Sequence, residues 1–146
     1  RYHPVQDYLR GLEWDGTNRC DTWLEEYLGA EDAPSGVGRR FLLSCARRAL
    51  TPGCKVDTTL ILVGEQGVGK SSAMRALVPT TDWFSDTPID LRNKDSYMAM
   101  QGVWIYEISE LSAWRGRDSE SIKAFLSAQV DRFRPPYGRN MVTLPQ

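Results

Sequence analysis

Apolar residues near the start of the chain recur at helical spacing, at Val5, Tyr8, Leu9 and Leu12. This spacing predicts a short amphipathic helix. A second helix is predicted at 22–28, where Thr22 and Glu25 form a capping-box pattern, and a third at about 37–50. We therefore expect residues 1–56 to form an N-terminal helical region.

From Asp57 onward the pattern changes to alternating strands and helices. The run Thr58–Val63 is apolar and rich in β-branched residues, which predicts a buried parallel strand, and a helix is predicted at 71–77. A second strongly apolar strand is predicted at Val103–Ile108. A short strand is expected at 82–85, and further helices at about 95–102 and 119–129. Because such alternation is typical of α/β proteins, we expect residues 57–146 to form a parallel sheet core.

The motif G-x-x-x-x-G-K-S lies between the first predicted strand and its helix. Its glycines let the backbone turn so that successive N–H groups point at an anion, Lys70 can reach the β- and γ-phosphates of a nucleotide, and Ser71 can ligate Mg²⁺. The strand before it and the helix after it are the context that a phosphate-binding loop requires. The alternative is a glycine-rich turn between two core elements. The predicted nucleotide-binding residues are Gly64, Glu65, Gln66, Gly67, Val68, Gly69, Lys70, Ser71 and Ser72.

Two glutamates stand at or just after the end of the second strongly apolar strand. Phosphoryl transfer needs one carboxylate for the Mg²⁺ shell and another to orient the attacking water. We assign Glu107, with Ser71, to the metal and Glu110 to the water, although the two glutamates could exchange roles. An acid that ends an apolar strand is costly to bury without a cation. The alternative is that one of them is a solvated loop acid or a cap.

Arginines form two groups. Arg132, Arg134 and Arg139 follow the acidic motif on a proline-rich segment, and a rigidly held guanidinium can stabilise charge on a transferring phosphate, within the chain or from a neighbouring subunit. We favour Arg134 and Arg139 for this role, with surface salt bridges to residues such as Asp131 as the alternative. The second group is most simply a solvated helix face, or else a contact for DNA phosphates: Arg39, Arg40, Arg47 and Arg48.

Composition narrows the classes of protein. Three cysteines without a C-x-x-C pair and a single histidine favour a reducing compartment and no structural zinc. No apolar run approaches the roughly 20 residues of a membrane span, and no signal-peptide pattern opens the chain. The net charge of −1 gives no argument for bulk attraction to nucleic acid. We expect a protein of a reducing cytoplasm with no membrane partner.

Taken together, these motifs show that the chain resembles the virulence-associated E family of phage and mobile-element proteins. That family consists of P-loop NTPases related to superfamily 3 helicases and often fused to primase domains. The resemblance covers nearly the full length. It rests on 3–5, 7–9, 14–16, 27–30, 52–57, 64–71, 83–86, 94–95, 102–105, Glu107, 110–111, 122–127 and 131–139.

The resemblance implies an AAA+-like or helicase-like sheet that binds ATP at 64–71, holds Mg²⁺ near Ser71 and Glu107, and assembles into a hexamer-like ring on replicating DNA. Relatives continue past 135–139 into another strand that ends in a T-T-N type motif, so the core is expected to be truncated on its C-terminal side and this piece alone to bind or hydrolyse nucleotide poorly. The catalytic set is then Lys70, Glu107, Glu110, Arg134 and Arg139.

The motifs and the resemblance together predict an ATPase domain of a phage- or prophage-encoded replication protein, of the helicase or primase-helicase type, that works in the bacterial cytoplasm. Its partners would be nucleotide, DNA through the full-length protein, and further copies of itself. Two alternatives stay open. One is a non-catalytic nucleotide-binding module that regulates assembly, and the other is a P-loop phosphotransferase, because the same phosphate cradle serves both activities.

Overall fold

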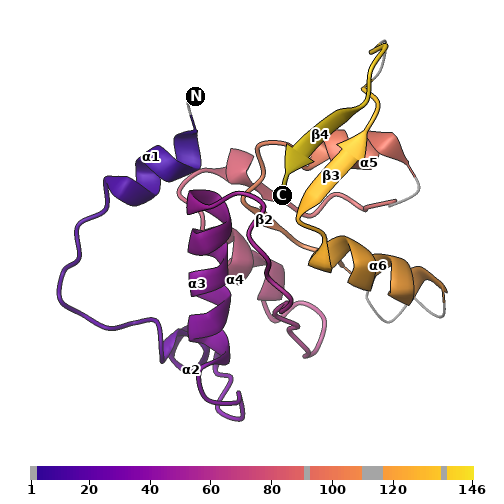
Figure 1. The fold of residues 1–146 in the computed structure, drawn as a ribbon. Coiled ribbons are helices and arrows are strands. Elements are labelled where there is room, and N and C mark those ends of the chain that lie inside the picture. Colours follow the sequence, from indigo (N-terminus) through magenta and orange to yellow (C-terminus); the bar gives the residue numbers. More distant parts are fainter. Residues whose placement is uncertain (1–2, 91–92, 110–116, 136–137) are drawn as a thin grey trace.

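The computed structural model describes residues 3–90, 93–109, 117–135 and 138–146, which form a small mixed α/β domain (Figure 1). Its helices and strands are α1 (Pro4–Arg10), α2 (Trp23–Leu28), α3 (Val37–Leu50), α4 (Lys70–Ala76), the 3₁₀ turn η1 (Thr81–Trp83), β1 (Phe84–Ser85), α5 (Lys94–Ala99), β2 (Ile105–Tyr106), α6 (Arg117–Ser127), β3 (Val130–Phe133) and β4 (Val142–Pro145).

The three helices expected in the first part of the chain are present. α1 begins after His3, whose ring nitrogen Nδ1 accepts a hydrogen bond from the N–H of Gln6 at 3.4 Å. α2 ends at Gly29, which adopts a left-handed conformation. α3 spans 37–50, as the spacing predicts. The capping box predicted for α2 does not form, because Thr22 is already in a helical conformation and its side chain makes no capping hydrogen bond.

The strands form two separate two-stranded sheets. β1 and β2 are parallel, with Phe84 opposite Ile105, and β2 lies beside α3 (Figure 1). β3 and β4 form an antiparallel hairpin, with Phe133 opposite Val142. This hairpin extends away from α1, α2 and α4, and the apolar pattern does not predict it (Figure 1).

The prediction of a strand at Thr58–Val63 is wrong, because the structure assigns no strand there. Leu60 and Leu62 pack against the core, whereas the exposed fractions of Ile61 and Val63 are 62% and 92%. Within the described part of the chain, no backbone hydrogen bond joins this run to a strand. A buried parallel strand needs neighbours on its edges and cover on both faces, and here only one face is covered. The parallel sheet is therefore short rather than an extended core.

The hydrophobic core lies between α2, α4 and the short parallel sheet. Its buried members are Trp23, Leu24, Met74, Val78, Phe84 and Ile105. Next to it, the rings of Tyr8, Trp83 and Trp104 meet edge to face with centroids 5.6–6.2 Å apart, which attaches α1 to the ends of β1 and β2. The indole N–H of Trp104 donates to the carbonyl oxygen of Cys45 on α3 at 3.0 Å. These contacts fix the strand that leads to Glu107.

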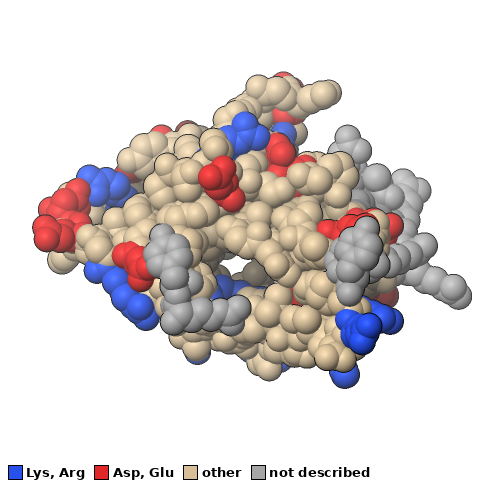
Figure 2. Space-filling view, turned by 90° about the horizontal axis from the view of Figure 1, so that it is seen from above, with Lys and Arg blue, Asp and Glu red and all other residues tan. Residues whose placement is uncertain are grey.

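The surface carries charges of both signs. Figure 2 shows lysines, arginines and carboxylates interspersed on one face, without a region of a single sign. None of the helices described here is long and apolar enough to cross a membrane. On the face shown in Figure 2, recognition of a charged partner would therefore depend on a local group of side chains.

Candidate functional site

The glycine-rich loop at 64–69 is exposed and leads directly into α4. Gly67 and Gly69 have φ values of 85° and 88°, in the left-handed region that other residues adopt only with strain. A Cβ atom on either glycine would meet no atom within 4 Å. The requirement for glycine here is therefore one of backbone conformation, and it gives the loop the turn that the motif predicts.

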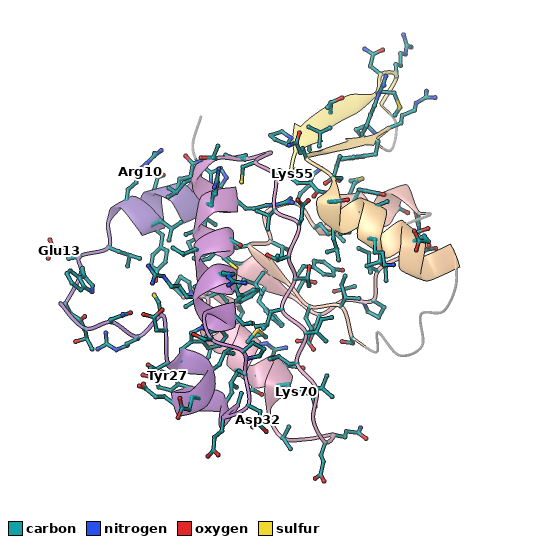
Figure 3. The ribbon with its side chains drawn as sticks, turned by 60° about the horizontal axis from the view of Figure 1, so that its bottom comes forward. Arg10, Glu13, Tyr27, Asp32, Lys55 and Lys70 are labelled. Carbon is teal, nitrogen blue, oxygen red and sulfur yellow. The ribbon has the colours of Figure 1, made fainter. Side chains whose placement is uncertain are left out.

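Lys70, the first residue of α4, folds back over this loop. Its Nζ donates hydrogen bonds to the carbonyl oxygens of Gly64 and Glu65, at 2.8 and 2.7 Å. Figure 3 shows Lys70 at the end of the molecule where α2 and α4 lie, the same end as Tyr27 and Asp32. The ammonium group is thus held by the loop whose backbone it would complement.

Ser71 and Glu107 meet although they are 36 positions apart in the sequence. The Ser71 hydroxyl donates to Oε1 of Glu107 at 2.7 Å, while the backbone N–H of Glu107 donates to the carbonyl oxygen of Ser85 at 2.8 Å. Glu107 therefore leaves β2 with its backbone still tied to β1. The pairing of these two side chains is the contact that the sequence predicts for a metal site.

The second carboxylate oxygen of Glu107, Oε2, is buried and has no hydrogen-bond partner among the described residues. A buried carboxylate oxygen without a partner is costly, and a cation is its natural complement. A hydroxyl and a carboxylate are oxygen ligands of the kind that Mg²⁺ prefers, and Mg²⁺ commonly takes only one or two ligands from the protein. The residues present therefore fit that ion.

No cluster of three or more histidine, cysteine or acidic side chains that could hold a metal occurs within 3–90, 93–109, 117–135 and 138–146. In the same ranges Cys20, Cys45 and Cys54 are all free thiols. Burial raises the pKa of the Cys45 thiol to about 11, so this thiol stays protonated and unreactive at neutral pH.

Of the remaining predicted site residues, Glu110 lies outside the described residues. Arg134 and Arg139 lie on the β3–β4 hairpin, where Nε of Arg134 donates to the carbonyl oxygen of Gly138 at 2.7 Å. Figures 1 and 3 both show this hairpin at the opposite side of the molecule from the start of α4. The structure therefore brings together Lys70, Ser71 and Glu107, but it does not bring the two arginines to them within one chain.

The arginines of α3 have different environments. Arg39 forms an exposed pair with Asp21 at 3.6 Å, and Arg47 is exposed, as a solvated face requires. For Arg48 the prediction of a solvated position is wrong, because this residue is half-buried and its guanidinium is hydrogen-bonded to the side chain of Gln146 at 2.8 Å. Helical spacing alone does not reveal this contact, since its partner is 98 positions away.

These features define a mixed α/β domain in which a glycine-rich loop, its lysine and a serine–carboxylate pair converge. A sequence model of the virulence-associated protein E-like domain matches residues 9–146, and the chain belongs to this family. A search of curated proteins found no match to the chain.

Proposed function

We propose that this domain binds ATP together with Mg²⁺ and hydrolyses its γ-phosphate, as part of a phage or mobile-element replication protein of the helicase or primase-helicase type. The contact between Ser71 and Glu107 carries the proposal, because it pairs the two side chains that a nucleotide-bound Mg²⁺ would need. Membership of the virulence-associated protein E-like family supports a phage or mobile-element association.

Each side chain of the site has a distinct role in this proposal. The backbone N–H groups of 64–69 donate hydrogen bonds to phosphate oxygens. The ammonium group of Lys70 gives up its hydrogen bonds to the two loop carbonyl oxygens and binds the β- and γ-phosphates instead. Ser71 and Glu107 hold Mg²⁺, which when bound neutralises charge that develops on the phosphates. Glu110 orients the attacking water, or exchanges this role with Glu107.

We further propose that Arg134 and Arg139 act outside their own chain, because the hairpin that carries them lies away from Lys70. In a hexamer-like ring they would reach the nucleotide of a neighbouring copy. Arg132, on the same hairpin, is exposed, so the hairpin also offers a local basic surface to DNA phosphates.

The test compares the wild-type chain with Lys70→Ala and with Lys55→Ala, a matched control whose exposed ammonium group is paired with Asp57. Binding of an ATP analogue is measured by calorimetry with Mg²⁺ present. We expect Lys70→Ala to weaken binding at least about tenfold, since it removes a charge-assisted phosphate contact. Lys55→Ala should bind like wild type. Equal affinity of the wild type and Lys70→Ala would refute the site.

A second candidate function is a nucleotide-binding module that controls assembly without turnover. The distance of the arginine hairpin from Lys70 favours it for an isolated copy, since the site then lacks a guanidinium for the transition state. Nucleotide affinity without phosphate release, even when copies assemble on single-stranded DNA, would support this candidate. A P-loop phosphotransferase is the less favoured alternative, and phosphate release stimulated by single-stranded DNA would argue against it.

A further inference from the structure

Arg48, near the end of α3, joins the helical region to the base of the β3–β4 hairpin. One terminal nitrogen of its guanidinium donates to the side-chain oxygen of Gln146 at 2.8 Å. The other lies 3.3–3.4 Å from carbonyl oxygens of Leu126, Ala128 and Val56. Leu126 belongs to the last turn of α6, where free carbonyls favour a cation. One side chain therefore contacts three segments.

Gln146 completes the attachment from the hairpin side. Its side-chain amide donates to the Asp131 carboxylate at 2.6 Å, and its backbone N–H donates to the carbonyl oxygen of Gln129 at 3.0 Å. The carbonyl oxygen of Gln146 accepts a hydrogen bond from the N–H of Gly53. These hydrogen bonds hold both ends of the hairpin at one place. We call the cluster formed by Arg48, Gln146 and Asp131 the Arg48 latch.

The same helix also holds the strand that leads to the candidate metal site. The carbonyl oxygen of Cys45, three residues before Arg48 and therefore on a neighbouring part of the helix face, accepts the hydrogen bond of the Trp104 indole. Trp104 immediately precedes β2, and Glu107 immediately follows it. A continuous chain of contacts therefore runs from the Ser71–Glu107 pair through β2 and α3 to the hairpin.

We infer that Arg48 is a positioning residue that fixes the arginine hairpin relative to the Ser71–Glu107 pair, with α3 as the rigid connection. Arg47 makes a natural comparison, because it is the same residue type on the same helix and is exposed. Positioning of the hairpin rests on the contacts of Arg48 and Gln146 described above. A response of the hairpin to nucleotide rests, in addition, on the proposed function.

The first experiment measures backbone hydrogen exchange across 130–145 without nucleotide, in the wild type, Arg48→Ala, Gln146→Ala and Arg47→Ala. Loss of either latch side chain should raise exchange in β3 and β4 about tenfold or more, because a charged hydrogen bond is removed in each case. Arg47→Ala should match the wild type. Unchanged exchange in both latch variants would overturn the inference.

Hydrogen exchange in α3 distinguishes loss of the latch from global unfolding. Protection of α3 against exchange should persist in at least one latch variant. If both variants lost protection in α3 together with the hairpin, the latch would be part of the core rather than a positioning device, and the inference would be wrong.

The second experiment adds a non-hydrolysable ATP analogue with Mg²⁺. In the wild type we expect slower exchange both at 64–72 and in the hairpin, and in Arg48→Ala slower exchange at 64–72 alone. An equal hairpin response in both proteins, or no hairpin response in the wild type, would overturn the coupling. If 64–72 showed no response in the wild type, the proposed nucleotide site would fail, while the first experiment would still decide whether Arg48 positions the hairpin.

Discussion

Glu107 is the residue whose environment most clearly points to a ligand. One of its carboxylate oxygens accepts the Ser71 hydroxyl hydrogen bond, and the other is buried without a partner among the described residues. Burying such an oxygen costs stability unless a cation or a donor compensates. We therefore expect this side chain to bind a cation rather than to stabilise the fold on its own.

This leads to a prediction for Glu107→Gln. Mg²⁺ alone should raise the melting temperature of the wild type, because binding to the folded state adds about 1.4 kcal/mol when the ion is tenfold above its Kd. Glu107→Gln should lose this response, since an amide cannot replace the anionic ligand. Thermal denaturation with and without Mg²⁺ measures the effect. Glu120→Gln, which changes an exposed carboxylate paired with Lys123, is the control and should respond like wild type.

We expect Asp131 to make the stability of the fold depend on pH. Burial raises the pKa of its carboxyl group, while the hydrogen bond from Gln146 and the charge of Arg48 act in the opposite direction. Burial raises the pKa of Tyr97, and the negative charge of Asp131 adds to this effect. Tyr97, Asp131 and Arg132 line one surface hollow. A raised folded-state pKa means that the protonated form is favoured by the fold. Its contribution to stability is therefore greatest below the unfolded pKa and is lost as the pH rises through the folded one.

We accordingly predict that Asp131→Asn is more stable relative to wild type at pH 7 than at pH 3. Asparagine keeps an oxygen that can accept the Gln146 hydrogen bond but carries no charge to desolvate. Urea denaturation of both proteins at the two pH values gives the difference in free energy of unfolding. A difference that is the same at both pH values would show that the carboxylate is not destabilised by its surroundings.

At the scale of elements, local patterns predict the helices better than the strands. α3 agrees with its predicted range because its signals, the helical spacing and the following turn, are local. Only Ile105 and Tyr106 of the strand predicted at Val103–Ile108 pair with β1, and Thr58–Val63 does not pair with any described strand. Strand formation depends on partners far away in the sequence, which an apolar run alone cannot specify.

Val63→Thr tests the correction at 58–63. Because 92% of the Val63 side chain is exposed, we expect the free energy of unfolding to change by no more than about 0.5 kcal/mol. Phe84→Ala, at a buried position of β1, should cost about 3–5 kcal/mol and serves as the contrast. Chemical denaturation measures both variants. A loss above about 1 kcal/mol for Val63→Thr would mean that this run is buried in solution.

At the scale of the whole molecule, the sequence predicts the members of the candidate site but not their distances. The sequence assigns Ser71 and Glu107 to one Mg²⁺ site, and the structure joins their side chains by a hydrogen bond. The separation of Arg134 and Arg139 from Lys70 depends on the direction of the hairpin, which is set by the Arg48 latch and not by local spacing. Contacts between residues so distant in sequence leave no periodic pattern.

That separation makes a prediction about assemblies of the full-length protein. Lys70→Ala keeps the hairpin but loses the phosphate contact, whereas the double variant Arg134→Ala and Arg139→Ala keeps the loop and loses the guanidinium groups. If the hairpin of one copy serves the site of the next, mixing the two inactive proteins creates some interfaces with an intact loop and an intact hairpin. Phosphate release by the mixture should then exceed the sum of the two proteins measured separately.

Mixing wild type with Lys55→Ala is the control and should give simple additivity. Additivity for the two inactive proteins as well would mean that the hairpin arginines do not complete a neighbour's site. Their role would then lie in contacting DNA phosphates. The salt dependence of DNA binding by the double variant would reveal such contacts.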